Sequence, residues 1–287
     1  MEFWQVDVFA ESPFRGNALA VFADGADLSR KQMQVIASEM NLSETTFVTN
    51  VSSDEYSVRI FTPRAELPFA GHPTIGTAWV LKQLGELRGS EVLQRSPAGA
   101  TAVNFDGDRA WFERSGEVFP DLKRDTPGVN DKLAKALGLT AGDIGLEPRE
   151  LGRSTDRLEA APTDIGIRQL MVPIRDVATL GRCRPVAALL EEFEGDGVYC
   201  FTAVGAGRLQ ARGFFSELGI EEDPATGSAA AGLGVYLAAR VGPIEAEIAQ
   251  GVEMGRPSRI HLKADGDVVR IGGRCERVAE GKLVSLP

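Results

Sequence analysis

Two stretches of this sequence match each other: residues 66–81 read ELPFAGHPTIGTAWVL, and residues 222–237 read EDPATGSAAAGLGVYL. Aligned at an offset of 156 residues, they are identical at five of sixteen positions, including one Pro and two Gly. Pro and Gly constrain the local backbone, so this identity indicates a repeated structure rather than a shared composition. Related tripeptides precede the two stretches, Arg59-Ile60-Phe61 and Arg212-Gly213-Phe214. The sequence therefore predicts two similar halves.

Each copy of the repeat predicts a turn that leads into a helix. From Gly71 to Leu81 the pattern is helical, and Pro73 fits the first turn, where a residue has no intrahelical partner for its N–H. The free amides and the positive dipole end of a helix start form an anion site. Two such starts that face each other predict a site that holds the carboxylate of a small substrate, in a cleft between the halves.

Short β-type runs alternate with helical patterns in the part of the chain before the first copy. A helix is predicted after Ser29, whose side chain can cap the first turn while Gln32 reaches back, and Asn41 is its predicted end. Strands are predicted at 3–9, 18–22, 45–49 and 56–62.

Two Asp-Gly pairs predict tight hairpins further along the chain. Asp106-Gly107 and Asp265-Gly266 are each flanked by β-forming residues and suit the positive φ that such turns require. We therefore expect the β structure to be mostly antiparallel.

The length of 287 residues suggests two domains. The segment 117–130 contains Pro and Gly with little periodicity and is the predicted crossing between them. The predicted domains are 1–118 and 119–277, and an alternative division assigns the last strand, at about 278–287, to the first domain.

Composition excludes several classes of function. The net charge of -10, with no run of Lys and Arg, argues against binding a nucleic acid. The longest uncharged stretch, 224–239, is shorter than the roughly 20 residues of a membrane span, and the polar start favours a cytoplasmic protein. Three widely spaced cysteines, Cys183, Cys200 and Cys275, lack metal-ligand spacing and are expected to be structural thiols. The fingerprints of dinucleotide sites, phosphate loops, zinc helices and nucleophile elbows are missing.

The repeated turns carry most of the side chains that are candidates for chemistry. His72 lies in the first turn, and Asp223, Thr226 and Ser228 lie in or beside the second. A lone His is often structural, and Asp and Ser at a helix start are often only caps. A side chain at a helix start also points toward whatever the free amides bind, so these two interpretations are compatible.

Glu44, in the stretch NLSETTFV, is the candidate acid or base. A Glu beside a strand is most often solvated, and the pattern alone favours that interpretation. A proton transfer without a cofactor, however, needs a carboxylate whose pKa is raised by burial, and the apolar residues Leu42, Phe47 and Val48 flank this one.

Taken together, the motifs resemble the PhzF-like proteins of the diaminopimelate-epimerase-like superfamily. The resemblance covers nearly the whole chain, in the family's order, through VDVFAESPFRGNALAVF, NLSETTFV, RIFTPRAELPFAGHPTIGTAWVL, GFFSELGIEEDPATGSAAAGLGVYL and QGVEMGRPSRI. It implies an α/β (α+β) fold of two pseudo-symmetric domains, each a curved, mostly antiparallel sheet around a central helix. It also implies an isomerase that needs no cofactor and forms a homodimer.

The resemblance also implies roles for individual residues. Glu44 stands where the family has its acid/base, and His72, Asp223 and Ser228 are the other expected catalytic residues. The expected substrate-binding residues are those of the two turns, namely Gly71, Pro73, Thr226 and Gly227. In the phenazine enzyme of this family, trans-2,3-dihydro-3-hydroxyanthranilate is isomerised by moving a proton from C3 to C1, after which the enol becomes a ketone.

The sequence lacks the pair of Cys residues that the related epimerases and racemases use. Related epimerases and proline racemases commonly use two Cys that precede the turn glycines, where this chain has Ala70 and Thr226. Racemisation by two thiols is therefore not expected. An epimerase that uses Glu44 with Asp223, and a binding protein for small carboxylates without turnover, stay open as alternatives.

Overall fold

The computed structural model describes residues 1–122, 128–147, 151, 156–193, 195–216 and 220–287. The N-terminal half contains two helices, α1 (Arg30–Met40) and α2 (Gly71–Gln83). Its strands are β1 (Glu2–Val8), β2 (Asn17–Phe22), β3 (Glu44–Val51), β4 (Glu55–Phe61), β5 (Glu66–Leu67), β6 (Glu91–Ser96), β7 (Gly99–Asp106) and β8 (Arg109–Ser115). The four strands predicted from the sequence are β1 to β4, each confirmed to within a few residues.

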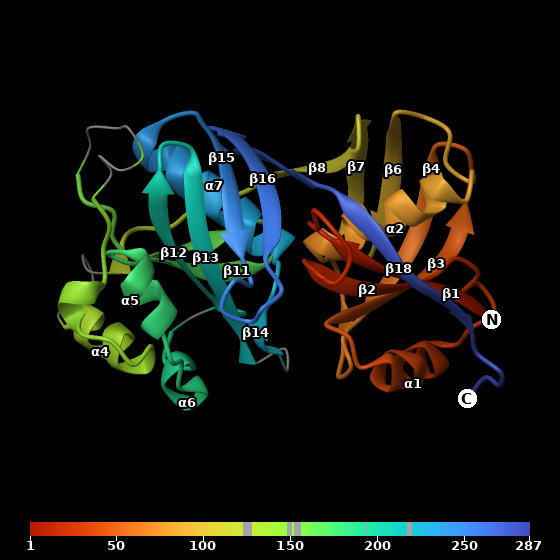
Figure 1. Cartoon of the computed structure of the whole chain (residues 1–287), viewed down its shortest axis with the longest axis horizontal. Helices are drawn as coiled ribbons and strands as arrows, with labels where there is room; N and C mark the ends of the chain where they lie inside the picture. The colour runs from red at the N-terminus through yellow and green to blue at the C-terminus, as the bar shows by residue number, and fades with distance from the viewer. Residues whose placement is uncertain (123–127, 148–150, 152–155, 194, 217–219) are drawn as a thin grey trace.

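The second half follows the same plan with additional short helices. Its helices are α4 (Val129–Ala136), the 3-10 turn η1 (Ala141–Asp143), α5 (Val177–Arg182), α6 (Ala187–Leu190) and α7 (Gly227–Val241). Its strands are β9 (Glu117–Val118), β10 (Ala161–Asp164), β11 (Arg168–Pro173), β12 (Val198–Gly205), β13 (Arg208–Phe215), β14 (Ile220–Asp223), β15 (Ile244–Gln250), β16 (Ser258–Asp265) and β17 (Val268–Gly273). The last strand, β18 (Cys275–Lys282), returns to the first half (Figure 1).

The two halves repeat one order of strand pairing. In the first half β1–β2 is antiparallel, β2–β3 parallel, β3–β4 antiparallel, β4–β6 parallel, and β6–β7 and β7–β8 antiparallel. In the second half β10–β11, β11–β12, β12–β13, β13–β15, β15–β16 and β16–β17 follow the same alternation. The predicted mixed fold of two similar, mostly antiparallel halves is confirmed.

The halves are tied together by their last strands. After β8 the chain enters the second half, where β9 pairs with β10, and after β17 it returns, so that β18 pairs with β1. Strands β8 and β17 pair with each other between the halves. The predicted domain boundaries stay a prediction, and residues 123–127 of the predicted crossing lie outside the described residues.

Each half wraps its sheet around one buried helix. Helix α2 contacts β1, β2, β3, β7, β8 and β18, and α7 contacts β9, β10, β11, β15, β16 and β17. Because these helices are surrounded, they lack a polar face, and α7 carries no charged residue before Arg240. No helix among the described residues is both long and apolar enough to cross a membrane.

Local sequence signals explain several boundaries. Ser29 and Gln32 form the predicted capping box of α1, and Asn41 ends that helix with a left-handed backbone. Both predicted hairpins are present, with Gly107 and Gly266 at positive φ. These turns bring β8 and β17 to the place where the halves join.

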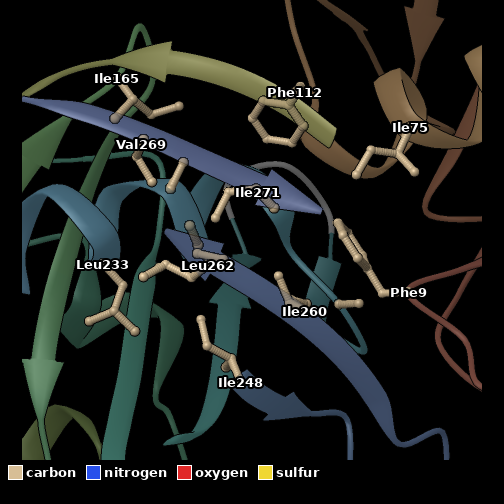
Figure 2. Packing of buried hydrophobic residues seen from close by; sticks show 14 of the residues in the cluster. Phe9, Ile75, Phe112, Ile165, Leu233, Ile248, Ile260, Leu262, Val269 and Ile271 are labelled. Atoms are coloured by element: carbon tan, nitrogen blue, oxygen red, sulfur yellow. The ribbon is translucent and has the colours of Figure 1, made fainter. Parts of the chain in front are cut away.

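A continuous apolar core runs across that junction. Figure 2 shows Phe9, Ile75 and Phe112 of the first half close to Ile260 and Ile271 of the second. All five side chains are fully buried. The core thus holds the two halves, and the starts of their central helices, against each other.

Candidate active site

The starts of the two central helices are in direct contact. A Cβ atom built on Gly71 would lie 2.6 Å from the amide nitrogen of Ser228 and 2.7 Å from the Cα of Gly227. A real Cβ does not approach backbone atoms so closely, and only glycine fits here. The repeat predicted a turn and a helix start in each half, and the structure brings these two helix starts together.

The candidate side chains gather around this contact from four elements. Glu44 is the first residue of β3, His72 the second of α2, Asp223 the last of β14 and Ser228 the second of α7. Their exposed fractions lie between 3% and 7%. The sequence suggested a cleft between the halves. In the structure the helix starts touch, and these side chains are buried around the contact between Gly71 and Gly227–Ser228, which we call the seam.

Glu44 faces His72 without a hydrogen bond between them. Oε2 of Glu44 lies 3.2 Å from Nε2 of His72, yet the geometry does not suit a hydrogen bond, and neither buried atom has a partner within the described part of the chain. Burial, and secondarily the charge of Asp223, raises the pKa of Glu44 well above its ordinary value. The interpretation of Glu44 as a solvated residue is therefore wrong.

His72 is a neutral imidazole at physiological pH. Burial lowers its pKa to about 3, because the charged form would lose its hydration. Its Nδ1 lies 3.2 Å from the side-chain amide nitrogen of Asn17, at the start of β2. The imidazole can therefore donate or accept a hydrogen bond in the seam, but it brings no positive charge.

Asp223 accepts hydrogen bonds from three side chains. Asn17 Nδ2 donates over 2.8 Å and Ser43 Oγ over 3.2 Å to Oδ1, and Thr226 Oγ1 donates over 2.6 Å to Oδ2. Burial raises the pKa of Asp223 to about 6, although these bonds favour the charged form. Because its carboxylate binds side chains, Asp223 is not a cap of α7.

The side chain of Gln250 holds the turn before α7 through several hydrogen bonds. Gln250, at the end of β15, donates to the backbone carbonyl of Asp223 over 2.8 Å and to Thr226 Oγ1 over 3.0 Å. It accepts from the backbone N–H of Thr226 and from the hydroxyl of Tyr199. These hydrogen bonds hold the turn before α7 against β15 and Tyr199.

Sequence reasoning missed Asn17, Ser43, Gln250 and Tyr199. Their partners are distant in the chain, 206 residues away in the case of Asn17 and Asp223. Nothing in the residue pattern around them marks such a contact. Pro73 and Gly227, in contrast, are buried at the helix starts as the sequence predicted.

Two buried carboxylates beside a neutral imidazole can exchange a proton with a bound molecule. The charge of Asp223 disfavours a second charge on Glu44, so the two carboxyl groups titrate together. A carboxyl group whose pKa is raised toward neutrality can both remove a proton and return it. Among the described residues, no cluster of His, Cys, Asp and Glu is suited to hold a metal ion.

Replacing Asp223 with Asn should lower the pKa of Glu44 while leaving it above the ordinary value, since burial remains and only the repulsion is lost. The measurement is an NMR titration of carboxyl carbons in protein labelled at Glu, with Glu44→Gln to assign the resonance. Asp265→Asn, in an exposed hairpin, is the control and should leave that pKa unchanged. An unmoved Glu44 titration in Asp223→Asn would contradict the coupling.

The fold consists of two pseudo-symmetric halves, and buried, titratable side chains gather where the starts of their central helices meet. Residues 6–281 match the model of the PhzC-PhzF family, described as phenazine biosynthesis-like protein. The chain belongs to this family.

Named relatives agree with this membership, and a solved structure has the same fold. The trans-2,3-dihydro-3-hydroxyanthranilate isomerase of Pseudomonas aeruginosa is 37% identical over 305 residues, covering 96% of this chain and 97% of the relative. An uncharacterised isomerase of Pasteurella multocida is 36% identical over 286 residues, covering 97% and 92%. A PhzF-family phenazine biosynthesis protein of Bacillus anthracis has the same fold, with a TM-score of 0.84, 22% identity and 99% coverage of both chains. The chain is an isomerase of this family.

Proposed function

We propose that this protein is a cofactor-independent isomerase in which Glu44 moves a proton within a small, carboxylate-bearing ring. The model substrate is the one in the name of its Pseudomonas relatives, trans-2,3-dihydro-3-hydroxyanthranilate. The observation that carries the proposal is the buried side chain of Glu44, whose pKa is raised and whose Oε2 lies 3.2 Å from Nε2 of His72 and has no hydrogen-bond partner among the described residues. We further propose that it works as a cytoplasmic homodimer.

The helix starts supply what a substrate carboxylate needs. The first amides of a helix have no intrahelical partner, and the dipole favours an anion. Helix α2 offers such amides at Gly71 and His72, and α7 offers them at Gly227 and Ser228. A carboxylate held by these amides would lie close to Glu44, because His72, the second residue of α2, has its Nε2 3.2 Å from Oε2 of Glu44. The hydroxyl of Ser228 is a further donor at this position.

In the proposed reaction, one carboxylate makes both proton transfers. Ionised Glu44 removes the proton from C3 of the ring, the electron pair shifts through the conjugated system, and Glu44 returns the proton to C1. The resulting enol becomes the ketone by a further proton shift, so atoms and charge balance without any other reactant. In this proposal Asp223 binds the amino or hydroxyl group of the substrate, and its charge adds to the effect of burial, which raises the pKa of Glu44.

The closed seam has a consequence for binding. Because the four candidate side chains are at most 7% exposed, a ring can reach them only when the two halves move apart at the helix starts. Closure around the ring would then exclude water and strengthen each electrostatic contact.

Proton NMR of the model substrate in heavy water tests the function. The expected result is loss of the C3 proton signal with deuterium at C1 and formation of the ketone. Exchange at a single carbon with inverted configuration would instead indicate an epimerase that uses Glu44 with Asp223. Binding without any exchange would indicate a binding protein and would overturn the proposal.

A further inference from the structure

Asn17 occupies a central place in the seam. It is the first residue of β2 and is 1% exposed. Its amide nitrogen Nδ2 donates to Oδ1 of Asp223 over 2.8 Å and to the carbonyl of Ala225 over 2.9 Å, both in the second half of the chain. The same nitrogen lies 3.2 Å from Nδ1 of His72 in the first half. A single amide group therefore contacts three groups around the candidate site.

The chemistry of the amide decides which histidine nitrogen carries the proton. The Ala225 carbonyl can only accept a hydrogen bond, so the NH₂ end of Asn17 is the end that faces these groups. An NH₂ group cannot accept a hydrogen bond, and Nδ1 of His72 must therefore be the unprotonated nitrogen. In a neutral imidazole the proton then sits on Nε2, the atom that lies 3.2 Å from Glu44.

The two amide hydrogens serve three acceptors. The two oxygens lie closer than the imidazole nitrogen, so the contact with His72 is the weakest of the three. It still excludes the other tautomer, because an N–H at Nδ1 would point at the hydrogens of the amide. The contact therefore determines the tautomer of His72 even though it adds little binding energy.

We propose that Asn17 is a positioning residue that keeps His72 in the Nε2–H tautomer and fixes Asp223 across the seam. This assignment rests on the proposed function only for its effect on turnover. In that tautomer His72 presents a donor, and no lone pair, to the side of the site where Glu44 lies. His72 therefore cannot take the substrate proton, and Glu44 is left as the base on that side.

Measuring the tautomer of His72 distinguishes the proposed positioning role of Asn17 from a merely structural one. Asn17 also joins the two halves, and losing it would weaken any protein that used it only as a connection. A connecting role would not decide which nitrogen of His72 is protonated. Nitrogen NMR of protein labelled with ¹⁵N-histidine reads this directly. The chain has only two histidines, and His261→Gln assigns the spectrum.

Two variants of Asn17 should change the Nδ1 atom of His72 in different ways. Asn17→Asp is nearly isosteric, and its carboxylate can accept a hydrogen bond from Nδ1, so the proton of His72 should move to Nδ1. Asn17→Leu removes the donor, so the Nδ1 resonance should move toward that of a nitrogen without a hydrogen bond. Both variants should lower kcat by on the order of 100-fold with a smaller change in KM, because proton transfer is affected more than binding.

Gln94→Leu is the matched control for lost stability. Gln94 is also a fully buried amide; it accepts from the Tyr56 hydroxyl over 2.8 Å and donates to Thr74 Oγ1 over 3.0 Å. None of these bonds involves His72 or Asp223. The control should unfold more easily than wild type while its His72 keeps the Nε2 proton and its kcat is unchanged.

Three results would overturn the assignment. One is a wild-type His72 that is protonated at Nδ1 or at both nitrogens, which needs no variant to observe. Another is an Asn17→Asp protein that keeps the Nε2 proton, and the third is an Asn17→Leu protein with wild-type kcat. Because the NMR measurements use no substrate, they stand even if the model substrate is not turned over, so failure of the proposed function is recognised separately.

Discussion

Replacing Glu44 with Gln should remove catalysis, lowering kcat by about 10²–10⁴-fold, the range that a positioned acid or base supplies. Gln has nearly the same shape as Glu but cannot remove a proton from carbon. Binding of the substrate should persist, because the helix amides that would hold its carboxylate are unchanged. The measurement is single-turnover kinetics together with equilibrium binding. Retained turnover in Glu44→Gln would show that another group is the base.

The same variant should be more stable than wild type, and the gain should depend on pH. Burial raises the pKa of folded Glu44 above the unfolded value near 4.5, so in the unfolded chain this group ionises first as the pH rises. Below that pH both states hold the proton and the two proteins should unfold alike. Above the unfolded pKa, the free energy of unfolding of wild type falls as the pH rises, until the pH reaches the folded pKa. The free energy of unfolding of Glu44→Gln does not show this fall.

We expect a gain of about 0.5–2 kcal/mol at neutral pH, as is common where a catalytic group is destabilising. Urea unfolding at several pH values between 4 and 8 would measure it. Glu280→Gln, an exposed position on β18, serves as the control and should show no such pH dependence. An equal stability of Glu44→Gln and wild type at all pH values would mean that Glu44 is solvated in solution.

The repeat was predictable because its signals are local. Pro and Gly determine backbone shape within a few residues, and the two turns followed by helix starts could therefore be read from residues 66–81 and 222–237. The capping box at Ser29 and the hairpin glycines are of the same kind. Each is decided by a neighbour in the chain, so each was found with nearly the right bounds.

The contacts of the site were less predictable, because they join residues that are far apart in the chain. Glu44 was selected by its apolar neighbours, but Asp223, whose charge adds to the effect of burial on its pKa, lies in the second half of the chain. Asn17 gave no signal, since its role comes from Asp223 and Ala225, 206 and 208 residues away. The return of β18 to pair with β1 is equally non-local, and the sequence suggested only that a last strand returns.

Adding a methyl group at Gly71 tests the contact between the halves, and it should lower both stability and turnover strongly. In Gly71→Ala the new Cβ meets the Ser228 amide and Gly227 within 2.7 Å, and these are backbone atoms that cannot rotate away. Relief requires α2 and α7 to separate, which also pulls the Ser228 amide away from His72. We expect a loss of about 3 kcal/mol in the free energy of unfolding, the upper part of the range for overpacking, and loss of turnover.

A graded set of glycine replacements makes this test specific. A Cβ on Gly227 would lie 3.1 Å from Gly71 Cα and from a ring atom of Phe9, so Gly227→Ala should cost less than Gly71→Ala. Gly142 has open space around its Cβ position and no positive φ, so Gly142→Ala should be neutral or slightly stabilising. Urea unfolding and turnover of the three variants should follow that order. If Gly71→Ala matched Gly142→Ala in both measurements, the helix starts would not be in contact in solution.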